Sequence, residues 1–265
     1  MVFPEEAHVA YEQNPLQEVT CQLRFPAILR VAAEPPAKFQ ELLRSDYEHY
    51  EEGPKPAVPL PDGPVGDRVK AIMQSLAAEG RFQGEHKFWS GDQRWSVVLT
   101  RDFVALQTTD YRSWTEFRPR MERVLDAFVS TYRPSYYTRV GLRYIDVIER
   151  STLGVSDRPW SELLSPHITG ELGADDLKDR IRHAARQVRI QLNDDGDQVM
   201  IRHGLVVGRV PTDPAFMVDS DFYTENRMET GSVLTKLDGY NQEAWRLFRW
   251  CIRPTLHNAL RPLAD

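Results

Sequence analysis

Two arginines four positions apart are the first side chains in the sequence that could bind an anion. The segment 139–144 reads Arg-Val-Gly-Leu-Arg-Tyr, and an extended strand would place Arg139, Gly141 and Arg143 on one face. At ~3.3 Å per residue the two arginines are about 13 Å apart, on either side of a notch where Gly141 has no side chain. Such guanidinium groups suit a phosphate or a carboxylate. The alternative is that each arginine pairs with an acid on a neighbouring strand, which is ordinary sheet chemistry.

A second candidate lies in the segment 216–225, where alternation places Asp219, Asp221, Tyr223 and Glu225 on one face. Close carboxylates can bind a divalent cation through oxygen or share a proton. Asp219 and Asp221 are therefore candidate metal ligands. They fit equally well as the ion-pair partners of the two arginines, or as a solvated face that does little.

The first strand offers supporting groups. Its polar positions, Glu18, Thr20, Gln22 and Arg24, alternate with apolar ones, and we expect Glu18 and Arg24 to assist the arginines in binding. A similar polar stripe follows at Gln187, Arg189 and Gln191. The acidic segment 193–197 favours a hairpin turn, because it lacks the glutamate that closes a calcium loop.

The common enzyme signatures are missing from the sequence. It contains no phosphate-binding glycine loop, no His-Glu-x-x-His and no Gly-x-Ser-x-Gly. Cys21 and Cys251 have no neighbouring cysteine or histidine at zinc spacing, and both sit among apolar residues, so we expect no disulfide and no cofactor. The net charge of −6 and pI near 5.7 argue against a nucleic-acid or anionic-membrane partner for the whole molecule.

The elements that must position these residues follow from periodicity. Alternating segments predict strands at 16–25, 86–90, 93–100, 103–108, 136–148, 187–192, 198–203 and 216–224. Apolar stripes at intervals of three and four predict aromatic-rich amphipathic helices after 35–36, at 69–76, at 113–132 and from about Asn241. The pattern predicts one α+β domain over 1–265, mostly antiparallel, with a Pro-rich loop at 53–66. Each half ends a strand meander in an aromatic-rich helix, which suggests a duplicated unit.

The N-terminus is acidic, and no stretch approaches the ~20 apolar residues that span a bilayer. We therefore expect a cytoplasmic protein without a membrane partner.

Three stretches carry a resemblance to a known family: 11–19 with Tyr-Glu-Gln-Asn-Pro-Leu, 111–117 with Tyr-Arg-Ser-Trp, and 139–146 with Arg-Val-Gly-Leu-Arg-Tyr. Their order and spacing resemble a sporadically distributed, uncharacterised bacterial protein family of about this length. Asp146 departs from the pattern, which has asparagine there. The resemblance implies a bacterial cytoplasmic protein and supplies no catalytic residues. Sporadic distribution suggests a role tied to mobile elements or phage defence.

Three functional hypotheses follow. The first is a non-enzymatic binding protein that presents a sheet face to a protein partner or a small anionic ligand through Arg139, Arg143, Glu18 and Arg24. The second is a metal-dependent, phosphate-directed enzyme that uses Asp219 and Asp221. The third is a homodimer that associates through an exposed aromatic helix face.

Overall fold

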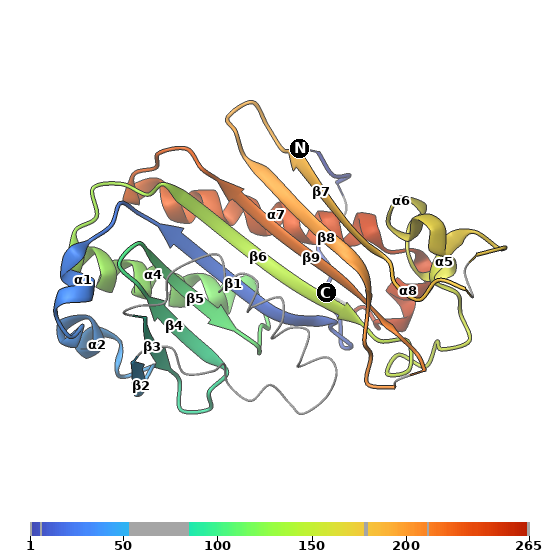
Figure 1. Ribbon diagram of the computed structural model, residues 1–265, viewed down its shortest axis with the longest axis horizontal. Coiled ribbons are helices and arrows are strands. Elements are labelled where there is room, and N and C mark those ends of the chain that lie inside the picture. The colour runs from blue at the N-terminus through green and yellow to red at the C-terminus, as the bar shows by residue number, and fades with distance from the viewer. Residues whose placement is uncertain (1, 6, 53–84, 178–179, 211, 264–265) are drawn as a thin grey trace.

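The computed structural model of the protein describes residues 2–5, 7–52, 85–177, 180–210 and 212–263. Its centre is one nine-stranded antiparallel sheet with the order β2-β3-β4-β5-β1-β6-β9-β8-β7 (Figure 1). The strands are β1 Leu16–Arg24, β2 His49–Glu52, β3 His86–Trp89, β4 Trp95–Leu99, β5 Phe103–Thr108, β6 Arg139–Ile148, β7 Ala185–Gln191, β8 Gln198–Val206 and β9 Ala215–Thr224. The prediction of a mixed α+β fold with an antiparallel sheet is confirmed.

Two long helices lie behind the sheet in Figure 1, α4 Trp114–Tyr132 and α7 Val233–Cys251. Shorter pieces lie at the two ends of the sheet: α1 Leu29–Ala33 and α2 Ala37–Leu43 at one end, and α5 Trp160–Leu163, α6 Pro166–Thr169 and α8 Pro254–Ala259 at the other. None of the helices in the described ranges is long and apolar enough to cross a membrane.

Local chemistry explains where the long helices begin. Ser113 accepts a hydrogen bond from the Glu116 backbone N–H and so caps α4 at the position where the helix was predicted to begin. The helix continues through Pro119, which falls in its second turn. The start of α7 was predicted at about Asn241 and lies at Val233. The apolar stripe extends upstream through Leu237, and one exposed Gly239 costs a helix only about 1 kcal/mol.

The core lies between the helices and one face of the sheet. Every second residue of β1 faces it, namely Val19, Cys21 and Leu23, and β6 contributes Val140, Leu142 and Tyr144. The apolar stripe of α4 completes it with Phe117, Met121 and Phe128. Both cysteines are buried there as unpaired thiols, as predicted. The segment 53–66 and the helix predicted at 69–76 lie outside the described residues.

Topology repeats between the two halves. The first half runs from β1 through the meander β2-β3-β4-β5, one strand longer than its counterpart, to α4, and β5 returns to pair with β1. The second half runs from β6 through β7-β8-β9 to α7, and β9 returns to pair with β6. The central strands β1 and β6 pair antiparallel and join the halves. This arrangement matches the expected repeat of a strand, a meander and a helix.

Candidate functional site

The candidate residues lie on the sheet face opposite α4 and α7. In β6, even-numbered residues such as Leu142 face the core, so Arg139 and Arg143 face the other way. The pairing register then aligns Thr20 and Asp221 with Arg143 on either side. We call this surface the open face. It consists of the side chains of β1, β6, β9, β8 and β7 that point away from α4 and α7.

Asp219 is the most deeply buried charge on the open face. Its side chain is 0% exposed, and Arg143 Nε and Nη2 donate to its two oxygens at 2.7 Å each. Arg202 Nη1 donates to the same carboxylate at 3.3 Å. Burial would lower the pKa of Arg143, but the hydrogen bonds and charge of Asp219 more than offset this, so its pKa is raised. One carboxylate thus orders two guanidinium groups, and the group of three keeps a positive charge.

Arg139 fills the notch that the sequence placed at Gly141. Its guanidinium lies over Gly141, so that a Cβ added there would clash with Nη1. From this position Nη2 donates to both oxygens of Asp221 at 2.8 Å. The guanidinium also stacks over the Tyr223 ring, 4.7 Å from its centroid. The absent side chain of Gly141 therefore makes room for an arginine, and no open notch remains.

Arg24 and Glu18 join the arginines from β1. Arg24 lies directly opposite Arg139 in the register, and like charges at that position repel. Both side chains turn along their strands, and Arg24 Nε donates to Gln22 at 2.9 Å. Arg24 is exposed and has no acidic partner among the described residues. Glu18 is buried, accepts from the Thr20 hydroxyl at 2.9 Å, and contributes to the raised pKa of Arg143.

The structure therefore brings Arg139, Arg143, Glu18 and Arg24 onto one surface and pairs both arginines with acids. Each arginine carries five N–H donors, and Arg139 uses only Nη2 on a described acceptor. Nη1 of Arg143 has no hydrogen-bond partner among the described residues. Both side chains are 14% exposed, so solvent or a ligand can reach them.

The open face has a positive excess although the molecule is acidic. Its strands carry five arginines against three carboxylates, in a chain of net charge −6. The arginines are Arg24, Arg139, Arg143, Arg189 and Arg202, and the acids are Glu18, Asp219 and Asp221. Arg202 was missed as a candidate, although the alternation of Gln198, Met200 and Arg202 on β8 was a usable signal.

The metal hypothesis places its ligands at the same carboxylates. Asp219 and Asp221 are engaged by arginines through their oxygens. Across the described part of the chain, no three His, Cys, Asp or Glu side chains gather as a metal site would need. A divalent cation at Asp219 and Asp221 would have to displace the guanidinium groups.

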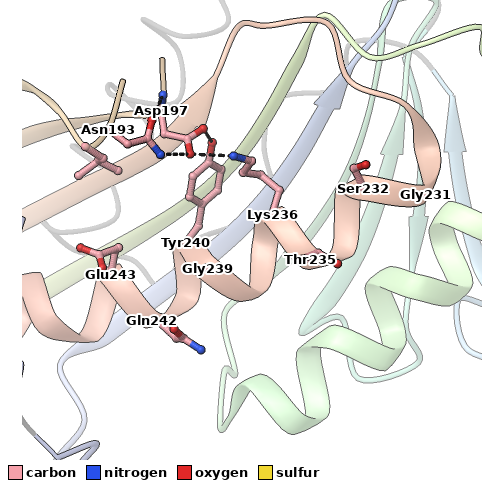
Figure 2. A pocket seen from close by; sticks show the side chains of 11 residues that line it. Asn193, Asp197, Gly231, Ser232, Thr235, Lys236, Gly239, Tyr240, Gln242 and Glu243 are labelled. Carbon is pink, nitrogen blue, oxygen red and sulfur yellow. Dashed lines mark hydrogen bonds and ion pairs between the residues drawn. The ribbon is translucent and has the colours of Figure 1, made fainter. Parts of the chain in front are cut away.

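A second polar cluster lies on the helical side, where the β7–β8 turn meets α7. A hollow of about 520 Å³ is lined by residues of both, including Asn193, Asp197, Lys236, Tyr240 and Glu243. Figure 2 shows Lys236 and Tyr240 pointing to Asp197, which they contact at 2.7 and 2.8 Å. Burial and the bond to Asp197 raise the pKa of Tyr240. Pairing of Gln191 with Gln198 confirms the predicted hairpin turn at 193–197, and Asp197 ties that turn to α7.

Comparisons with known proteins define no family. The sequence matches no protein-family model and no curated protein. Among solved structures, the chain is similar to a crystal structure of lombricine kinase with 10% identity and a TM-score of 0.30, over 88% of this chain and 66% of the kinase chain. A likeness of this size supports no argument about activity. The resemblance to the bacterial family and the link to mobile elements stay predictions.

Proposed function

We propose that the protein is a non-enzymatic binding protein that holds an anionic group, a phosphate or a carboxylate, on the open face beside Arg24, Arg139 and Arg143. The observation that carries this proposal is that the arginines are held in place and still have N–H groups to donate. Arg139 and Arg143 are fixed by buried or half-buried carboxylates and keep N–H donors that no described residue uses. Arg24, which no described acid neutralises, lies beside them.

Fixed arginines bind anions better than mobile ones. A flexible arginine loses about 2 kcal/mol of rotamer entropy when it is held in one geometry. Here the ion pairs with Asp219 and Asp221 have already ordered both guanidinium groups. A bound anion would gain charge-assisted hydrogen bonds without that cost. The excess of two positive charges favours an anion over a neutral ligand.

Arg143→Ala is a poor test, because it would leave the buried carboxylate of Asp219 with only the longer contact from Arg202 and cost roughly 3–5 kcal/mol of stability. Arg24→Gln is cleaner, since Arg24 is exposed and forms no ion pair with a described residue. The double variant Arg139→Gln with Asp221→Asn removes a positive and a negative charge together. Arg94→Gln is the matched control, because Arg94 is exposed in a surface pair with Asp110 off the open face.

The experiment is a thermal-shift titration with inorganic phosphate, citrate and nucleoside phosphates, followed by calorimetry. Binding to the native state raises Tm by mass action. We expect a shift for the wild-type chain and for Arg94→Gln. Arg24→Gln should reduce the affinity about threefold to tenfold, and the double variant should abolish the shift while still unfolding cooperatively.

Two results would contradict the proposal. Equal shifts in the wild-type chain and both open-face variants would place the anion elsewhere. A shift that requires Mg²⁺ or Mn²⁺, and that is lost in Asp219→Asn, would favour the metal-dependent enzyme instead.

A further inference from the structure

One edge of the sheet is a long exposed strand. β7 contains seven residues, of which all but Ile190 are exposed, and it pairs with β8 over its whole length without a bulge. It contains neither proline nor lysine, two of the residues with which edge strands resist pairing, and its charged residues are Arg186 and Arg189. β2, at the opposite end of the sheet in Figure 1, has four residues and ends in two glutamates. The β7 edge is therefore the better template for another strand.

The backbone groups that point outward from β7 can be assigned. Leu205 N–H donates to Ala184 O, and Leu192 N–H donates to Asp197 O, so these even-numbered positions of the hairpin face β8. Antiparallel strands alternate such positions. The outward N–H and C=O groups hence belong to Ala185, Gln187, Arg189 and Gln191. None of them has a backbone partner beyond β8 among the described residues.

We propose that β7 pairs antiparallel with β7 of a second copy of this chain, about a two-fold axis at Val188. This register places Gln187 opposite Arg189 and Ala185 opposite Gln191. These are the outward-pointing positions, so each pair exchanges two hydrogen bonds. Val188, 45% exposed in one chain, then faces its own copy at a non-hydrogen-bonded position, where side chains lie closest.

Charge complementarity selects a second copy as the occupant. The five residues directly before β7, 180–184, are basic, with exposed Arg180 and Arg182, and the turn after it is acidic, with exposed Asp194 and Asp195. Antiparallel pairing brings the basic flank of each copy to the acidic flank of the other. In the register centred on Val188, the turn that contains Asp194 comes to the same end of the paired strands as Arg182 of the other copy, and this happens at both ends. Moving the axis to Arg189 would place that arginine against its own copy, which repels.

The dimer differs from the predicted one, which used an aromatic helix face. It joins the two sheets into one and continues the open face from each copy to the other through Arg189 and Gln187. The dimer does not depend on anion binding. A failed dimerisation test would therefore leave the anion-binding proposal standing, and a failed titration would leave the dimer standing.

A disulfide tests the register. Val188→Cys would face its own copy at a distance that a cystine can bridge. On mild oxidation of the full-length chain we expect a covalent dimer on a non-reducing gel. The native cysteines are buried and should not contribute. Val210→Cys is the matched control, because Val210 is similarly exposed at 41% but lies outside β7. Equal amounts of dimer from both variants, or none from Val188→Cys, would overturn the pairing.

Charge reversal tests the flanks without cysteine. Asp194→Arg should weaken the dimer at least about tenfold in sedimentation equilibrium, because it repels Arg182 twice. Adding Arg182→Asp should restore the affinity to within about threefold. Gln187→Pro removes an outward N–H that β8 does not use, so it should also give a monomer with an unchanged circular dichroism spectrum. A wild-type chain that stays monomeric at high micromolar concentration would refute the proposal.

Discussion

Asp146 shows how a single buried side chain can make stability depend on pH. It lies on the core side of β6 and forms no hydrogen bond or ion pair with a described residue. Burial raises its pKa to about 7. An unfolded aspartic acid titrates near 3.9. The folded chain therefore binds more protons than the unfolded chain between about pH 4 and pH 7, and the free energy of unfolding falls as pH rises through that window.

Asp146→Asn should remove this pH-dependent loss in the free energy of unfolding. At ~1.4 kcal/mol per pKa unit the loss is on the order of 4 kcal/mol above pH 7. We expect the variant to be more stable than the wild-type chain by about 2–4 kcal/mol at pH 8 and to match it near pH 4, in urea unfolding followed by circular dichroism. Asp126→Asn, on the exposed side of α4, is the control and should change neither value. A stability difference that is the same at both pH values would show that Asp146 is not the titrating group.

At the scale of elements, Asp197 connects the β7–β8 hairpin to α7. Its buried carboxylate accepts hydrogen bonds from Asn193 and Tyr240 and pairs with Lys236. The residues of the turn were sufficient to predict it, but the turn is also fixed by contacts with α7, about forty positions later in the chain. Because β7 is otherwise exposed, this contact is the main polar link between the hairpin end and the helical layer in the described structure.

Tyr240→Phe should loosen that link. A hydrogen bond to a charged group contributes about 1.5–3 kcal/mol, and we expect a loss of stability in this range. Amide hydrogen exchange should accelerate most in 185–206. The matched control is Tyr223→Phe, whose hydroxyl donates to the neutral Gln198 at 3.3 Å. The two variants having equal effects would mean that Asp197 gives the contact no special strength.

The whole molecule shows which features local patterns can predict. Alternation located nearly all the strands because one face of most of them packs on the core, and the same alternation placed Arg139 and Arg143 together. It could not show that β9 lies next to β6, which pairs Asp219 and Asp221 with those arginines. Strand order depends on contacts between residues some 80 positions apart, as in the Arg139–Asp221 pair. Local patterns therefore could not predict which strands lie side by side to form the open face.

The two halves should unfold together. The central pairing of β1 with β6 runs without interruption from Glu18 to Arg24, and one apolar core contains residues of both α4 and α7. Neither half can lose its sheet without exposing the core of the other, so a single cooperative transition is favoured.

Three of the six tryptophans lie in the first half, at 89, 95 and 114, and three in the second, at 160, 245 and 250. Replacing either set with phenylalanine makes fluorescence report on one half. We expect both variants to show urea midpoints that coincide with their own circular dichroism. Midpoints that differ between fluorescence and circular dichroism would show that the halves are separate folding units joined along β1 and β6.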